Sequence, residues 1–159
     1  RGIDESAVAE VVGVRREETL GRLLDAVAER NTQLASSLVP AVLQQPKTSA
    51  VPVVMALTTQ TLAFAVSQSS GIPQARRSGE FYSLLQRGAS NMTGRSWGEA
   101  VSAWTRSAGR WTVADLDHAL DILLQADLAL KGSKVSSEEQ ILGTVVLALC
   151  SGTERSQVA

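Results

Sequence analysis

The chain has 159 residues, of which 44% are hydrophobic and 19% charged, and its formal net charge is −1. This length and composition are typical of one globular domain, or one domain with a small appendage, and not of a disordered chain. The balanced charge argues against a strongly basic nucleic-acid module. The longest apolar run, AVPVVMAL at 50–57, is far shorter than the roughly 20 residues of a membrane span.

The N-terminal part predicts two helices separated by a glycine. Apolar residues recur there at helical spacing, without the alternation that is typical of strands. A short helix is expected over residues 4–12, with Asp4 as its N-cap and Gly13 as its stop. A longer helix is expected over residues 17–30, with its leucines on one face.

The next two expected helices contain prolines. The helix expected over residues 32–45 includes Pro40, which should bend or divide it. In the helix expected over residues 52–68, Pro52 lies in the first turn, where proline is tolerated. The passage SQSSGIPQARRSG at 67–79 is typical of a surface connection.

The C-terminal half predicts further helices, two of which begin with capping boxes. The sequences SWGE at 96–99 and SSEE at 136–139 each place a hydroxyl and a carboxylate where they satisfy first-turn amides. The helices are expected at residues 79–87, 97–108 and 137–150, with a long helix opened by 112–115 between the last two. The sequence therefore predicts an all-α protein, a compact bundle of about seven helices.

Residues that could carry out catalysis are scarce. The chain has one histidine, His118, and one cysteine, Cys150, and no cluster of these residue types, so neither a zinc site nor a Cys–His nucleophile pair is expected. A single cysteine fits a reducing cytoplasm, and we interpret Cys150 as a small buried hydrophobe. Asp115, Asp117 and Asp121 lie where the long helix begins and complement its dipole. We expect no catalytic site, no cofactor and no metal.

Tryptophan recurs every seven residues, at Trp97, Trp104 and Trp111, among arginines. One interpretation is the core face of a helix, since this spacing places Trp97 and Trp104 on one stripe. Another is a nucleic-acid surface, where tryptophans stack on bases and arginines neutralise phosphates. A third combines tryptophans inside the domain with arginines that face a partner.

Charge is unevenly distributed along the chain. Residues 73–110 hold six arginines and two acids, whereas residues 115–139 hold six acids and two lysines. This polarity suits docking against a charged neighbour, or it places opposite charges on separate solvated faces. The candidate partner-facing residues are Arg76, Arg77, Arg87 and Arg95.

An aspartate interrupts the leucine stripe of the long helix, LDHALDILLQADLALK at 116–131. At helical spacing Asp127 shares a face with Leu116, Leu120, Leu123 and Leu130, and this face is widened by Leu124 and Leu128. Because an unpaired buried charge is strongly disfavoured, we expect an ion pair. Lys131 is the i+4 neighbour of Asp127, and Arg106 and Arg110 are the candidates for a buried partner. Alternatively, the leucine face ends before Asp127, which is then exposed and joined only to Lys131.

The C-terminal third, LDHALDILLQADLALKGSKVSSEEQILGTVVLALC, resembles the C-terminal signature of the delta subunit of the bacterial DNA polymerase III clamp loader. In that family a leucine-rich helix ends in Asp, an apolar pair and Lys, and a Gly-containing turn leads to a final helix. The corresponding positions here are Asp127, 128–130, Lys131, Gly132, 138–139 and 141–149. GRLLDAVAERNTQLA at 21–35 is similar to the opening collar helices, and IDESAVAEVVG at 3–13 to the end of the preceding lid domain. The helix expected at 52–68 departs from the family, because it lacks the basic residue that commonly occurs there.

The resemblance implies a collar-type domain without enzyme activity, in an accessory subunit of the DNA-directed DNA polymerase complex. Residues 1–15 would be the end of the AAA-like lid domain, 16–150 the helical collar domain and 151–159 a frayed tail. The chain begins at Arg1 without a methionine, and we expect a missing N-terminal domain, through which alone the sliding clamp would be bound.

The partners implied by the resemblance are the other clamp-loader subunits, of the gamma/tau and delta prime type, in the bacterial cytoplasm. Asp127 would then be paired within the domain or across the collar interface. DNA contact would be indirect or weak, and no membrane would be involved. The alternative function is a free-standing helical nucleic-acid-binding domain that uses the Arg/Trp segment 76–111.

Overall fold

The computed structural model describes residues 5–88, 93–132 and 136–152, and all the regular elements of this described part are helical. The all-α prediction is therefore confirmed for this part. The elements are α1 (Glu5–Ala28), α2 (Thr32–Leu43), α3 (Ala50–Ser69), α4 (Gln74–Arg87), α5 (Trp97–Ser107), the 3-10 helix η2 (Ala108–Arg110), α6 (Val113–Gly132) and α7 (Glu138–Ser151).

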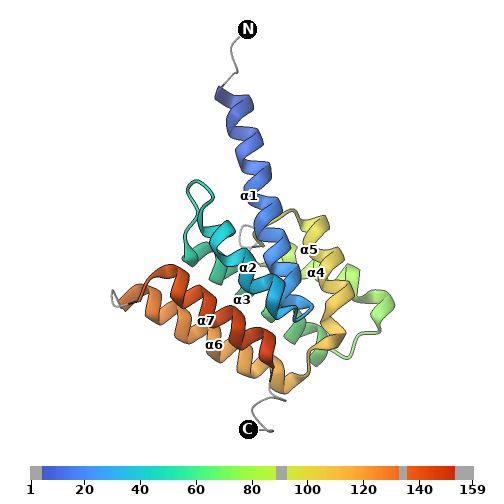
Figure 1. The fold of residues 1–159 in the computed structure, drawn as a ribbon. Helices are drawn as coiled ribbons and strands as arrows, with labels where there is room; N and C mark the ends of the chain where they lie inside the picture. Colours follow the sequence, from blue (N-terminus) through green and yellow to red (C-terminus); the bar gives the residue numbers. More distant parts are fainter. Residues whose placement is uncertain (1–4, 89–92, 133–135, 153–159) are drawn as a thin grey trace.

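The helices surround α3, and the first half of α1 projects beyond them (Figure 1). α3 lies against α6, α2 lies against both α1 and α7, and α6 and α7 form an adjacent pair. α4 and α5 form a second pair, on the other side of the bundle (Figure 1). The α4–α5 pair and the α6–α7 pair therefore present separate surfaces.

The core is formed by aliphatic side chains of all the helices and by a few aromatic ones. Phe81 of α4 meets Trp104 of α5 edge to face, with ring centroids 5.5 Å apart. Both side chains are 1% exposed. Burying a large apolar side chain contributes about 1.5–3 kcal/mol, so this contact holds α4 and α5 together.

Two predicted helix boundaries are wrong. Gly13 does not stop a helix, because α1 continues from Glu5 to Ala28. A glycine inside a helix costs only about 1 kcal/mol relative to alanine, which a helix as long as the 24 residues of α1 tolerates. α4 begins at Gln74 rather than residue 79, so the connection after α3 is correspondingly short. Pro73 provides the fixed φ, here −57°, that suits a helix start.

The remaining helix signals agree more closely with the structure. Pro40 lies inside α2 and does not divide it, and Pro52 lies in the first turn of α3. The capping box of α7 is shifted by one residue from the predicted one, since Ser137 and Gln140 bond each other's backbone amides. At α5 the Ser96 hydroxyl accepts a hydrogen bond from the Glu99 amide, at 3.3 Å. The expected cap at Asp4 and most of the expected tail lie outside the described residues.

The predicted division between residues 15 and 16 stays a prediction, and α1 runs through this position without a break. Among the described helices, α3 is long and apolar enough to cross a membrane by length and composition. More than half of its most apolar window, 56%, is buried inside the bundle, as in the core helix of a soluble protein.

Candidate interaction surfaces

Asp127 pairs with Lys131, and not with either of the proposed arginines. The Lys131 Nζ donates to the Asp127 carboxylate at 2.9 Å, and the two side chains are 68% and 34% exposed. Arg106 instead donates to the Ser102 hydroxyl one turn earlier in α5, at 2.9 Å. The expectation of a buried Asp127 partner within the domain is wrong, because the apolar face of α6 turns away from Asp127.

The buried face of α6 consists of Leu116, Ala119, Leu123 and Ala126. Leu124 and Leu128, which the sequence pattern assigns to the same face, are each 55% exposed. α6 packs closely on α3 and α7, so small alanines occupy part of its contact positions. Two leucines one turn apart are thereby left at the surface.

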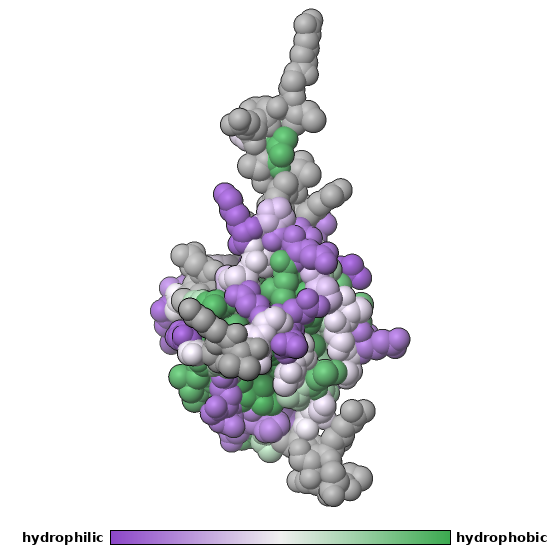
Figure 2. Space-filling view, turned by 60° about the vertical axis from the view of Figure 1, so that its left-hand side comes forward, coloured by the Kyte–Doolittle hydropathy of each residue, from purple (hydrophilic) through white to green (hydrophobic). Residues whose placement is uncertain are grey.

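A groove with a volume of about 670 Å³ runs between α6 and α7. Its walls combine apolar side chains, such as Ile122 and Ile141, with small ones, such as Ala129 and Ala148. On α7, Leu147 is 49% exposed. Figure 2 shows hydrophobic surface between hydrophilic groups in the lower half of the molecule. The α6–α7 pair therefore combines a hollow with exposed leucines, which is typical of protein-binding surfaces.

The α6–α7 pair carries acidic side chains, of which one lines this groove. Asp121 lines it, Asp117 is exposed one turn earlier, and Glu138 and Glu139 are exposed where α7 begins. Glu138 also has a role in folding, because its carboxylate accepts a hydrogen bond from the Ala50 amide at the start of α3, at 3.1 Å. This bond replaces the N-cap side-chain bond that Ser49 does not make.

The candidate arginines lie largely on the α4–α5 side. Exposed arginines are Arg76, Arg87, Arg106 and Arg110, whereas Arg77 is half-buried and Arg95 is buried. The acidic α6–α7 pair and the basic α4–α5 pair thus lie on different sides of the bundle (Figure 1). Arg95 is the exception among the proposed partner-facing residues, because its side chain points into the domain.

The tryptophans belong to the core. Trp104 is 1% and Trp111 3% exposed, and Trp97 is partly buried against the same core. The Trp111 indole donates to the Ala28 carbonyl oxygen at 2.9 Å, at the end of α1. Two of the three tryptophans therefore have no face available for stacking on bases. The core interpretation is confirmed for them, and a nucleic-acid surface in this segment would rest on the arginines alone.

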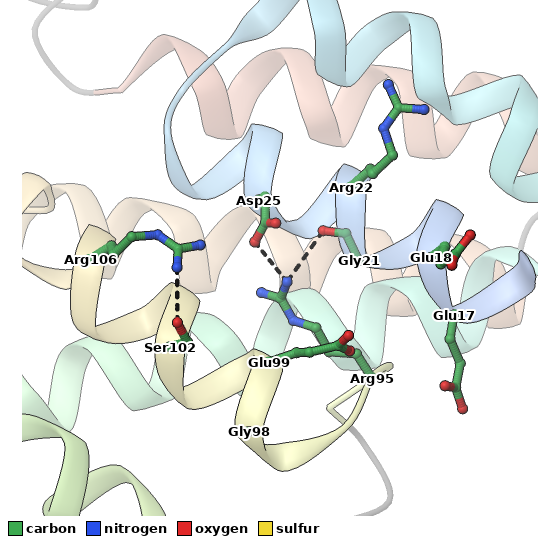
Figure 3. A pocket seen from close by; sticks show the side chains of 10 residues that line it. All are labelled: Glu17, Glu18, Gly21, Arg22, Asp25, Arg95, Gly98, Glu99, Ser102 and Arg106. Atoms are coloured by element: carbon green, nitrogen blue, oxygen red, sulfur yellow. Dashed lines mark hydrogen bonds and ion pairs between the residues drawn. The ribbon is translucent and has the colours of Figure 1, made fainter. Parts of the chain in front are cut away.

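A second groove, with a volume of about 520 Å³, lies between α1 and α5 (Figure 3). Arg95 lies in its wall, and its Nη1 donates to Asp25 at 2.7 Å and to the Gly21 carbonyl oxygen at 3.4 Å. The Arg95 side chain is only 4% exposed. Glu17, Glu18, Glu99, Arg22 and Arg106 complete the charged walls of this groove.

Among the acids whose side chains the structure describes, Asp115 is the most deeply buried, whereas its sequence position indicates only a role at the helix dipole. Its carboxylate lies 2.6 Å from the guanidinium of Arg30, and Asp115 is 5% exposed. Arg30 also lies over the Trp111 ring, 4.3 Å from its centroid. Asp115 and Thr112 bond each other's backbone amides, so the same carboxylate caps α6. The sequence TVAD at 112–115 carries this cap signal, but the Arg30 partner is 85 residues away.

Cys150 is buried, as its apolar surroundings in the sequence predict. Its thiol lies close enough to this ion pair to feel the charge of Arg30. Burial raises the pKa of its thiol to about 11, although a hydrogen bond from Thr32 and the charge of Arg30 act in the opposite direction. A thiol with so high a pKa is a poor nucleophile at neutral pH. Within the described residues no group of acids, histidines and cysteines could hold a metal ion, and His118 is exposed.

Comparison with known proteins gives no relative from which a role could be transferred. No family model matches the chain, and neither a curated protein nor a solved structure is significantly similar to it.

Proposed function

We propose that this chain is the collar domain of a clamp-loader delta subunit, which packs with the other loader subunits into the collar of the complex. The proposal rests on the resemblance of residues 116–150, supported by the order of the upstream segments. The role is that of a scaffold within the machinery that opens and loads the sliding clamp during DNA replication. It requires apolar and complementary charged surfaces rather than a catalytic site.

The observation that supports a scaffold most directly is the exposure of Leu124 and Leu128 on α6, one of the two helices that form the α6–α7 groove. A fully buried leucine stabilises a protein by about 1.5–3 kcal/mol, and a half-exposed leucine by much less. Replacing either leucine by a polar residue would therefore cost a monomer little stability. We assign this surface to the collar domain of a neighbouring loader subunit. The proposed occupant is a helical, basic surface of that subunit.

Charge complementarity is the argument for this occupant. The α6–α7 pair is bordered by acids, and exposed arginines occur on the α4–α5 pair on the other side of the bundle. If the other subunits share this distribution, the basic side of one domain meets the acidic side of the next. Head-to-tail contacts of this kind close into rings when the rotation permits.

The projecting half of α1 supports the same proposal (Figure 1). A helix that stands clear of its bundle offers surface to a neighbouring domain, and Val8 within it is 45% exposed. We propose that this part of α1, up to residue 15, is the end of the lid domain of the same subunit.

The test is size-exclusion chromatography with light scattering on the chain alone and mixed with the C-terminal domains of the other loader subunits from the same organism. The proposal expects a mixed complex at micromolar concentration. Leu124→Glu and Leu128→Glu should each weaken it, while Leu62→Glu on α3, at similar exposure, should not. A wild-type chain that stays alone in every mixture would contradict the proposal. Circular dichroism of each variant establishes that the helices remain formed.

A further inference from the structure

The buried guanidinium of Arg95 is only half satisfied. Its Nη1 bonds Asp25 and the Gly21 carbonyl oxygen, while Nε and Nη2 are buried without a hydrogen-bond partner in the described structure. Buried polar atoms are almost always hydrogen-bonded, and an unsatisfied charged group is strongly unfavourable. Such an arrangement is typical of a site that an external group completes.

The two unpaired atoms form one edge of the guanidinium. An arginine edge with two parallel N–H groups matches the two oxygens of a carboxylate, so this edge can bind one carboxylate in bidentate fashion. An anionic acceptor gains more from this edge than a neutral one, because hydrogen bonds between two charged groups are the stronger ones. The geometry therefore favours an anionic group with two oxygens, a carboxylate or a phosphate.

A second arginine reaches the same groove. Figure 3 shows Arg106 extending from α5 on the side toward which the second terminal nitrogen of Arg95 points. Arg106 donates to the Ser102 hydroxyl, and it is exposed, so it can turn toward an anion without loss of core contacts. An anion between these side chains would meet two cations and one hydroxyl.

The rim of the groove determines which kind of anion fits. Glu17, Glu18 and Glu99 line it together with Arg22, and Asp25 is already bonded to Arg95. These carboxylates repel a chain of phosphates but accept a segment that carries basic residues next to one acid. A protein segment of mixed charge fits the groove better than a nucleic acid does.

We infer that the α1–α5 groove binds one carboxylate side chain of a protein partner, held by the Nε–Nη2 edge of Arg95 and by Arg106. The identity of that partner rests on the proposed function, in which it is a neighbouring loader subunit. Because Nε and Nη2 are covered in the free chain, binding displaces a neighbouring side chain. Glu99 is exposed and lines the same groove, so it can move without loss of core contacts.

The first experiment follows the side-chain Nε–H signal of Arg95 by NMR, in the chain alone, during titration with a capped Ala-Glu-Ala-Lys peptide and with sodium acetate. The expected result is a saturable shift, with the peptide binding more tightly than acetate. Arg106→Gln should weaken peptide binding about tenfold, since it removes one charge-assisted hydrogen bond. Arg110→Gln, an equally exposed arginine that does not line the groove, should leave it unchanged.

Glu99→Gln separates this inference from a simpler arrangement in which Glu99 itself pairs with Arg95 in solution. The inference expects this variant to bind the peptide at least as tightly as the wild type, with the Arg95 signal of the free chain little changed. A large shift of that signal in free Glu99→Gln would overturn it, and so would a linear, unsaturated response to the peptide. Tighter binding of a thymidine oligonucleotide than of the peptide would assign the groove to a nucleic acid instead.

The second experiment repeats the light-scattering assay of subunit mixtures with Arg106→Glu and, as control, Arg110→Glu. A wild-type complex that Arg106→Glu leaves unchanged would contradict the assignment of the groove to a neighbouring subunit, and the proposed function would stand. Saturable peptide binding without any mixed complex would instead contradict the proposed function and support the carboxylate site.

Discussion

The guanidinium of Arg30 lies 2.6 Å from the carboxylate of Asp115, and this ion pair joins the end of α1 to the start of α6. Arg30 reaches it from a residue with a φ of +58°, just past α1. Trp111 lies against the same guanidinium and bonds the last residue of α1. Two helix ends that are distant in sequence are thereby held by one cluster of interactions.

Asp115→Ala should strongly destabilise the domain. The change leaves Arg30 without its partner in a mostly buried position, and it also removes the cap of α6. We expect the free energy of unfolding to fall by roughly 3–5 kcal/mol, as measured by urea denaturation. Asp117→Ala, two residues along the same helix and exposed, should change it by less than about 0.5 kcal/mol. Equal effects of the two variants would show that the ion pair is not what joins the helices.

Asp127→Ala should have little effect on stability. Its partner Lys131 is 68% exposed, and an exposed i,i+4 pair contributes about 0.3–0.5 kcal/mol before screening by salt. Urea denaturation at low and at high salt should give nearly the same small loss. A loss above about 2 kcal/mol would mean that Asp127 has a buried partner, contrary to the structure.

Gly152→Ala should disturb the Arg30–Asp115 ion pair, because Gly152 lies next to the Arg30 guanidinium. Gly152 has φ +66° and ψ −179°, a conformation that is essentially restricted to glycine, and an added Cβ would meet the Arg30 guanidinium. The expected loss exceeds the roughly 1–3 kcal/mol of the backbone conformation alone. Gly71→Ala is the matched control, because Gly71 also has a positive φ, +62°, but nothing lies within 4 Å of its added Cβ. Thermal unfolding of both variants measures the difference, and a smaller loss for Gly152→Ala would contradict the contact.

The stability contributed by the protonated thiol of Cys150 should be lost at high pH. Since burial raises the pKa of this thiol from 9.0 to about 11, the folded chain keeps a proton that the unfolded chain releases. The contribution is therefore complete below pH 9 and falls as the pH rises toward 11. Between pH 9 and pH 11 the free energy of unfolding should fall less for Cys150→Ala than for the wild type, by up to about 2 kcal/mol. Urea denaturation at a series of pH values measures this difference. Parallel pH profiles for the two proteins would contradict this prediction.

The helical nature of the chain, its caps and most of its helix boundaries could be predicted from local sequence. Leucines and alanines at helical spacing and the N-cap hydroxyl of Ser96 act through neighbours within a few residues, whereas the predicted capping box at 136–139 was one residue off. Such signals are independent of the rest of the fold. Of the open interpretations of the tryptophans, the core face holds for Trp104 on α5, while Trp111 is buried from outside that helix and Trp97 is only partly buried.

Tertiary packing decided which of several apolar positions became buried. α6 carries leucines on more than one face, and its contacts with α3 and α7 bury Leu116 and Leu123 but leave Leu124 and Leu128 exposed. No periodicity in a single helix determines where its neighbours will lie.

The charged residues show most clearly the difference between what local sequence predicts and what only the fold determines. From sequence, Asp115 and Asp127 are both aspartates on one amphipathic helix, and Arg95 is one arginine among six in a basic segment. Only the fold places Arg30 beside Asp115 and Asp25 beside Arg95, from positions 85 and 70 residues away in the chain. The energy of a charge depends on its solvent exposure and on its partner, and both are properties of the assembled bundle.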